Sequence, residues 1–470
     1  MTTTAPRTRR EHDLLGDRNV PEQVYWGIHT LRALENFPLS GERVGDVPDL
    51  VRALALVKKA AALSNAGLGL LPHRTASAVT AACDRLVEGE FHDQFPVSLV
   101  QGGAGTSTNM NANEVIANVA LEHLGHPCGT YTVIHPNEHV NLGQSTNDVY
   151  PTALKLAAIT AAHRLIDALE HLEEAFARKA HEFSDVVKVG RTQLQDAVPM
   201  TLGQEFGTYR VMVAEDVARL REALVHLHEI NLGATAIGTG LNAHPDYATA
   251  VREHLIALTG LPLATAPDLV EATQDCGAFV LLSGTVKRAA VKLSKICNDL
   301  RLLSSGPRTG LGEITLPARQ AGSSIMPGKV NPVIPELVNQ VAFSVIGNDT
   351  TITMAAEAGQ LQLNAFEPVI ASCLFRSIGH LTEAVTALSD RCIDGITANT
   401  PHLARLVDNS IATVTVLNPH IGYQAATDVA TEALATGRPV TRIVRERGLL
   451  DDHTIDELLH PARLAHGALP

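Results

Sequence analysis

Residues 279–303 read FVLLSGTVKRAAVKLSKICNDLRLL, and their apolar side chains recur at alternating steps of three and four. This spacing places the apolar side chains on one face of a helix that packs against other helices at a shallow angle. The apolar series consists of Phe279, Leu282, Val286, Ala289, Leu293, Ile296, Leu300 and Leu303. The sequence therefore predicts one long helix across the whole stretch.

Three further stretches predict helices of similar length. The same spacing recurs in residues 152–183 and 213–227, and another helix is expected from about Pro332 past Val345. Helices in globular proteins average about 11–12 residues, so these are long. One helical pair could not bury so many apolar faces, and we therefore expect an all-α fold with a central bundle of long helices.

The composition changes along the chain and suggests three domains. Residues 1–146 mix shorter helical patterns with loops rich in Gly, Pro and Asn, and residues 147–400 carry the long helical patterns. Residues 401–470 are again short, charged and broken by loops. The expected organisation is an N-terminal domain, a central helical-bundle domain and a small C-terminal domain.

The charge balance and the cysteines exclude several classes of protein. The 470 residues include 37 Lys and Arg against 50 Asp and Glu, a net charge of −13, which disfavours nucleic acid or an anionic membrane as partner. No apolar run approaches the roughly 20 residues of a membrane span, and no signal peptide is expected at the N-terminus. The six cysteines form no CxxC pair, so we expect free thiols and a cytoplasmic protein.

Four segments rich in Ser, Thr, Asn and Gly interrupt the helical patterns, and each precedes a predicted helix. They are residues 105–109, 144–148, 190–196 and 322–332. Helix capping explains any one of these segments, taken alone, as well as a functional site does. Asn331, for example, is the expected N-cap before Pro332. Four such segments together indicate an anion site, since helix N-termini and hydroxyl and amide donors suit a small dicarboxylate.

Other ligand motifs fail on spacing or residue type. Five residues separate Gly322 from Gly328 where a phosphate loop has four, and Val330 stands where Ser or Thr would bind magnesium. The sequence contains no HExxH or GxSxG motif, and its Gly238–Gly240 pair lacks the third glycine of a dinucleotide fingerprint. We therefore expect no metal and no cofactor.

The segment GSSIMPGKVNP at 322–332 resembles the signature loop of the aspartase/fumarase superfamily. Residues 144–148 and 190–196 resemble the two other signature regions, and the resemblance runs from about Asp13 to about Leu450. It implies an all-α homotetramer whose central helices form a twenty-helix bundle. It also implies active sites built from three subunits.

Within the superfamily the chain is more similar to aspartases than to fumarate hydratases. The aspartase-like stretches are residues 13–16, 27–33, 268–273, 298–308 and 347–351. Fumarases and some aspartases carry His after the threonine of residues 190–196, where this chain, like other aspartases, has Gln193. The resemblance therefore implies reversible deamination of L-aspartate to fumarate and ammonia, a carbon–nitrogen lyase reaction. Fumarate hydratase and a non-catalytic structural member of the superfamily are the alternatives.

The resemblance also implies a role for each candidate site residue. Ser323 is expected to be the base that removes the Cβ proton, and no metal or cofactor takes part. The donors expected at the β-carboxylate, which becomes the enediolate, are Thr106, Ser145, Thr146 and Ser324. Lys329, Asn331 and Thr192 are expected at the α-carboxylate. Asn147 is expected at the amino group, together with Gln193.

The length of one predicted helix bears on assembly. A helix over residues 152–183 is about 48 Å long at 1.5 Å per residue. It separates residues 145–147 from Thr192 along the chain, so one chain could not bring both to the same small substrate. Composite sites in an oligomer follow from this length, as they do from the resemblance.

Overall fold

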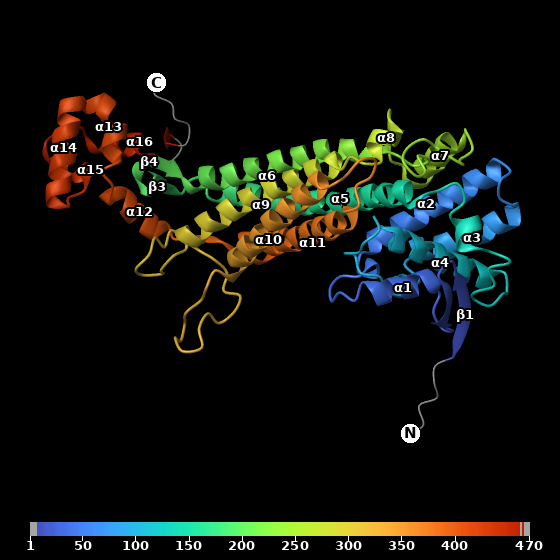
Figure 1. The fold of residues 1–470 in the computed structure, drawn as a ribbon. Helices are drawn as coiled ribbons and strands as arrows, with labels where there is room; N and C mark the ends of the chain where they lie inside the picture. Colours follow the sequence, from blue (N-terminus) through green and yellow to red (C-terminus); the bar gives the residue numbers. More distant parts are fainter. Residues whose placement is uncertain (1–6, 461–462, 465–470) are drawn as a thin grey trace. The chain divides into compact units, whose positions relative to one another are not determined.

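The computed structural model describes residues 7–460 and 463–464 (Figure 1). It divides into two compact units. Unit 1 contains the residues up to Ile166 together with 219–287 and 344–380, and unit 2 contains 167–218, 288–343 and the residues from Leu381 onward. The three-domain division at residues 146 and 400 stays a prediction.

Five long helices dominate the fold, and the all-α prediction is confirmed. They are α5 (Thr146–Glu182), α6 (Leu202–Val225), α9 (Gly277–Leu303), α10 (Val333–Glu357) and α11 (Glu367–Arg391). Each of the four stretches predicted to be a long helix corresponds to one of these elements, although residues 183, 226–227 and 332 lie just outside the helix ends. The apolar series of residues 279–303 is buried throughout α9, because its steps of three and four keep one face toward its neighbours.

Polar contacts join the long helices within unit 2. Arg288 of α9 pairs with Asp216 of α6, and Asn339 of α10 donates to the Ser294 carbonyl of α9 at 3.1 Å. His171 of α5 lies 2.7 Å from Asp390 of α11. Phe176 of α5 also packs edge-on against Phe206 of α6, and these contacts together place the unit 2 segments of all five helices in one bundle.

Shorter helices complete both units. The unit 1 helices are α1 (Ile28–Asn36), α2 (Pro48–Gly67), α3 (His73–Val87), α4 (Thr106–His123), α7 (Tyr247–Thr259) and α8 (Leu269–Ala272). The unit 2 helices that follow the bundle are α12 (Thr400–Asn409), α13 (Thr413–Ile421), α14 (Tyr423–Thr436), α15 (Val440–Glu446) and α16 (Asp452–Leu458). No helix in the described part of the chain is long and apolar enough to cross a bilayer.

Two antiparallel hairpins stand beside the helices. They are β1 (Thr8–Asp13) with β2 (Gly16–Pro21), and β3 (Val187–Thr192) with β4 (Gln195–Thr201). Four strands of two residues each complete the set: β5 (Glu229–Ile230), β6 (Ala264–Thr265), β7 (Ile314–Thr315) and β8 (Thr397–Ala398).

The hairpin β3–β4 corrects the expectation that residues 190–196 lead directly into a helix. The segment forms the turn of the hairpin, and α6 starts only at Leu202. Val189 of β3 is buried against Val407 and Ala412, more than 200 residues further along the chain. Local periodicity could not reveal this strand, because packing against distant residues stabilises it.

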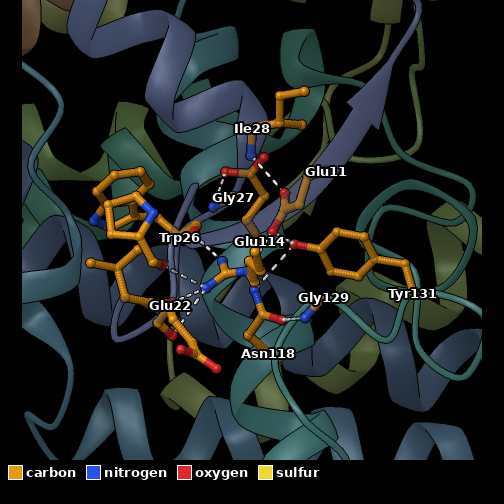
Figure 2. A network of polar contacts seen from close by, with 12 residues as sticks. Glu11, Glu22, Trp26, Gly27, Ile28, Glu114, Asn118, Gly129 and Tyr131 are labelled. Atoms are coloured by element: carbon orange, nitrogen blue, oxygen red, sulfur yellow. Dashed lines mark hydrogen bonds and ion pairs between the residues drawn. The ribbon is translucent and has the colours of Figure 1, made fainter. Parts of the chain in front are cut away.

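A buried carboxylate fixes α1 against α4 in unit 1 (Figure 2). Glu114 of α4 accepts hydrogen bonds from the backbone N–H groups of Gly27, His29 and Thr30 and from the Thr30 hydroxyl, at 2.7–3.1 Å. Neighbouring Glu11 accepts from the Ile28 N–H at 2.8 Å. These bonds satisfy orphan donors at the start of α1. Burial raises the pKa of Glu114 to about 7, and the hydrogen bonds oppose that rise.

The six cysteines are free thiols, as expected. Cys128 is half-buried, and the other five are buried: Cys83, Cys276, Cys297, Cys373 and Cys392. Burial raises the pKa of each thiol, to about 12 for Cys83 and Cys392.

Candidate active site

The predicted site residues of unit 1 lie at two adjoining helix N-termini. Thr106 is the first residue of α4, and Asn109, one turn further, donates to the Thr146 hydroxyl of α5 at 3.0 Å. Gly105 precedes α4 with φ 88°, and a Cβ at this position would lie 2.6 Å from the Tyr150 ring of α5. Only glycine allows this approach, so the structure brings Thr106 and the start of α5 together.

Ser145 caps α5. Its hydroxyl accepts from the Asn147 N–H at 3.2 Å, while the Ser145 N–H donates to Asp148 at 3.0 Å. The Ser145 hydroxyl serves the second helical N–H and the Asp148 carboxylate serves the Ser145 N–H, so the capping interpretation of residues 144–148 is correct at Ser145. Thr146 is buried, and the Asn147 side chain donates to the Ala236 carbonyl at 2.7 Å.

A buried lysine, which was not among the residues predicted from the sequence, supports the N-terminus of α5. Lys58 of α2 donates to the side-chain oxygens of Asn141 and Gln144, both at 2.9 Å. Burial lowers the pKa of Lys58 to about 7, against the opposing charge of Asp148. A signal existed in the sequence, since Lys58 interrupts the apolar run ALALVKKAAAL at a helical spacing that predicts burial.

Asp148 is a second buried charged residue at the N-terminus of α5. Its carboxylate accepts from the backbone N–H groups of Ser145, Gly233 and Thr235 at 2.9–3.1 Å. Burial raises its pKa to about 6, and these bonds together with Lys58 oppose the rise. The loop after β5 is therefore fixed onto the N-terminus of α5.

Unit 2 contains the other predicted residues, in two segments. Thr192 and Gln195 pair across the two-residue turn of the β3–β4 hairpin, formed by Gln193 and Leu194 with φ values of 53° and 63°. Both values fit a type I′ turn, where Asn and Gly are the usual residues. Keeping Gln and Leu in left-handed conformations costs about 1–2 kcal/mol each. Thr192, Gln193 and Leu194 are all exposed.

Ser323 lies in a loop closed by its own hydrogen bonds. The Gly322 N–H donates to the Lys329 carbonyl at 2.7 Å, and the Asn331 side chain donates to the Gly322 carbonyl at 2.8 Å. Within this loop the Ser323 Oγ accepts from the backbone N–H groups of Ile325 at 3.2 Å and Met326 at 3.0 Å. Two backbone donors therefore converge on the hydroxyl oxygen.

Lys329 and Asn331 of this loop form a hydrogen-bonded pair. Lys329 Nζ donates to Asn331 Oδ1 at 2.9 Å, and Lys329 is exposed, as is Ser324. The expectation that Asn331 caps α10 is wrong by one residue. The first helical bond runs from the Glu336 N–H to the Pro332 carbonyl, and the Asn331 side chain closes the loop instead.

The predicted residues thus form separate groups. Thr106 and residues 145–147 belong to unit 1, whereas Thr192, Gln193 and residues 323–331 belong to unit 2. Across the described residues, no hydrogen bond joins Thr192 or Gln193 to the Ser323 loop. Nor does the described chain contain a cluster of three His, Cys, Asp or Glu side chains arranged to hold a metal.

Hydroxyl and amide donors at helix starts, a serine oxygen held by two N–H groups and an exposed lysine suit an anionic substrate that gains negative charge during reaction. Two family models match the chain. The model described as lyase matches residues 16–347, and the one described as fumarase C C-terminus matches residues 414–466. The chain belongs to the aspartase/fumarase superfamily.

Similar proteins of this superfamily cover nearly the whole chain. An aspartate ammonia-lyase of Pseudomonas fluorescens is 58% identical over 465 residues, covering 99% of this chain and 97% of its own length. One from Escherichia coli K12 is 54% identical and covers 98% of this chain and 96% of its own.

Solved structures of the superfamily share the fold. A crystal structure titled fumarate lyase:delta crystallin from Brucella melitensis, bound to cobalt, matches with a TM-score of 0.95 at 55% identity, covering 98% of this chain and all of its own. A class II fumarase from Schistosoma mansoni matches with a TM-score of 0.92 at 36% identity, covering 98% of this chain and all of its own. The resemblance inferred from the three signature regions is thereby confirmed.

Proposed function

We propose that this chain is an aspartate ammonia-lyase that converts L-aspartate to fumarate and ammonia reversibly and without oxidation. The similarity to aspartate ammonia-lyases at 54–58% identity over nearly the full chain supports the reaction. The observation that carries the chemistry is the Ser323 oxygen, which accepts two backbone hydrogen bonds inside a closed loop.

The difficult step is removal of a weakly acidic proton from Cβ. A serine hydroxyl is a poor base unless its alkoxide form is stabilised. The N–H groups of Ile325 and Met326 already point at the Ser323 oxygen, and a hydrogen bond to a charged acceptor is roughly twice as strong as one to a neutral acceptor. They therefore stabilise the alkoxide more than the hydroxyl. This difference lowers the pKa of the Ser323 hydroxyl and makes the alkoxide available as the base.

The carbanion left by this step spreads into the β-carboxylate as an enediolate. Donors placed where this charge develops lower the barrier, and one such donor is worth about 3–4 kcal/mol. We assign this role to four residues, Thr106, Ser145, Thr146 and Ser324. The adjoining starts of α4 and α5 support the assignment, because their N–H groups add to the hydroxyl donors.

The remaining contacts hold the substrate in place. Lys329, Asn331 and Thr192 are assigned to the α-carboxylate, and the short contact between Lys329 and Asn331 supports their acting on one group. Asn147 and Gln193 are assigned to the amino group, which leaves as ammonia. No cofactor is assigned to this reaction.

The test compares three substrates and one variant. Purified protein is offered L-aspartate, L-malate and adenylosuccinate side by side, and fumarate formation is followed by ultraviolet absorbance. We expect turnover of L-aspartate; turnover of L-malate alone would favour fumarate hydratase, and no turnover would favour a structural member. Ser323→Ala should lower kcat by at least about 10²–10⁴-fold. Ser77→Ala, at an exposed serine of α3, is the control and should retain activity.

We also propose a homotetramer with composite sites, located in the cytoplasm. Large apolar side chains of the bundle helices are exposed in the single chain, which supports an assembly that covers them. They include Leu281 and Val291 of α9 and Leu337, Phe343 and Met354 of α10.

Subunit mixing tests the composite site. Ser145→Ala/Thr146→Val and Ser323→Ala are each expected to be inactive, and the two are unfolded together and reassembled. If the two segments come from different chains, roughly a quarter of the sites become fully wild type. Activity that stays at the level of the separate variants, in confirmed mixed tetramers, would place both segments in one chain.

A further inference from the structure

Four charged side chains form a balanced network at the base of the β3–β4 hairpin. Glu313 faces Arg191 through Oε1, and its Oε2 lies 2.8 Å from Lys188 Nζ. Lys188 also pairs with Glu205 in the first turn of α6. The Glu313 side chain is completely buried and that of Lys188 is 2% exposed. Two positive and two negative charges offset one another, as buried ions require.

The backbone of Glu313 is held as firmly as its side chain. Its N–H donates to the Leu303 carbonyl at the end of α9, and its carbonyl accepts from the Asn399 N–H, both at 2.9 Å. The next two residues form β7, which pairs with β8. Glu313 therefore stands at the fixed root of the connection between α9 and α10, and this connection carries Ser323.

The two cations belong to the strand that carries the other unit 2 segment. Lys188 and Arg191 both lie in β3, and Arg191 directly precedes Thr192. Among the described residues, no other hydrogen bond or ion pair joins the β3–β4 hairpin to residues 304–332. The only polar link between these two segments thus runs through one carboxylate.

We infer that Glu313 is a positioning residue, whose carboxylate clamps the hairpin carrying Thr192 and Gln193 to the root of the loop carrying Ser323. The inference rests on the proposed function for the roles of those three residues. Without the clamp, each segment keeps its own hydrogen bonds and the hairpin keeps its packing on Val407 and Ala412, but the direct polar link that sets the position of one segment relative to the other is lost. A displacement of about 1 Å at a catalytic group can cost on the order of 10²-fold in rate.

The test variant is Glu313→Gln, which keeps the side-chain volume and removes the charge. We expect kcat with L-aspartate to fall about tenfold or more and KM to rise about fivefold or more, because both the base and an α-carboxylate donor lose their positions. A merely structural role would reduce the folded fraction and hence the apparent kcat, leaving KM unchanged. Glu313→Asp retains the charge on a shorter side chain and should recover part of both losses.

Glu205→Gln is the matched control. It removes the other carboxylate that pairs with Lys188, but Glu205 has no link to the Ser323 loop. We expect kcat and KM within about threefold of wild type. An equal loss in Glu205→Gln and Glu313→Gln, or an unchanged KM in Glu313→Gln, overturns the clamp.

Hydrogen exchange gives a readout independent of activity and of complete folding. In Glu313→Asp, and in any folded fraction of Glu313→Gln, backbone amides of residues 187–201 and 314–332 should exchange faster than in wild type, while those of α14 should not change. Exchange unchanged in both segments overturns the inference. If wild-type protein does not deaminate L-aspartate, the proposed function fails, and the exchange result still decides whether the clamp exists.

Discussion

Replacing Asp148 with Asn should destabilise the chain severely through unmet hydrogen bonds. The Asp148 carboxylate is completely buried and serves three backbone donors. One oxygen accepts from the Ser145 N–H at 3.0 Å, and the other accepts from the N–H groups of Gly233 at 3.1 Å and Thr235 at 2.9 Å. An asparagine side chain offers one acceptor oxygen in place of two.

The magnitude follows from counting the groups left without partners. If the Asn oxygen faces Gly233 and Thr235, its NH2 group meets the Ser145 N–H, and two buried donors lose an acceptor. If the side chain flips, the two donors of the loop lose theirs instead. Each buried unsatisfied group costs about 1–3 kcal/mol, so two such groups should lower the free energy of unfolding by about 2–6 kcal/mol.

Urea unfolding at equal protein concentrations measures this loss, because oligomer stability depends on concentration. The control is Asp246→Asn, in which the replaced carboxylate is 78% exposed in its ion pair with His244. The control should change the free energy by less than about 0.5 kcal/mol. A loss below about 1 kcal/mol in Asp148→Asn would refute the count of unmet donors, and so would equal losses in the two variants.

Three further outcomes are expected. Burial lowers the pKa of Lys58 to about 7, so above that pH the unfolded chain binds one more proton than the folded chain. The free energy of unfolding of wild type, relative to Lys58→Met, should therefore rise by about 1.4 kcal/mol per pH unit between pH 7.5 and 9. A difference between the two proteins that does not vary with pH in urea unfolding contradicts this. Thr201 and Gln204 exchange hydrogen bonds at 3.0 Å at the start of α6, so Thr201→Ala should cost about 1 kcal/mol, with exposed Thr208→Ala as the control that loses clearly less. Gln193→His should gain no malate dehydration, since the choice between hydroxide and ammonia as leaving group needs more than one altered contact; measurable fumarate from L-malate would show otherwise.

The long helices could be predicted from the sequence because their signal is local. The apolar residues of α9 recur every three or four positions and need no knowledge of a partner. The hairpin β3–β4 could not be predicted in the same way, since Val189 packs against residues more than 200 positions away. Its turn also lacks the Gly or Asn that would have revealed it, because Gln193 and Leu194 adopt the left-handed conformation.

The same distinction between local signals and long-range contacts applies to the candidate site. Its hydroxyl-rich segments were found because they interrupt helical patterns at helix starts and in one loop. The supporting charges Lys58 and Glu313 were missed, because helical spacing can predict that Lys58 is buried but not which partners the fold brings near either side chain. Lys58 bonds to Asn141, 83 residues away, and Glu313 meets Arg191 across 122 residues. The spacing of residues along the sequence does not show which distant residues the fold brings into contact.

The buried thiols have a practical consequence for watching the Ser323 loop move. Burial raises the pKa of Cys83 and Cys392 to about 12, so both stay in the thiol form at pH 7, whereas alkylating reagents react with thiolates. A cysteine introduced at Met326, whose side chain is 49% exposed, would carry an ordinary thiol in open solvent. A fluorophore or spin label would therefore attach to the loop in preference to the five buried cysteines, and half-buried Cys128 is the native cysteine to replace first.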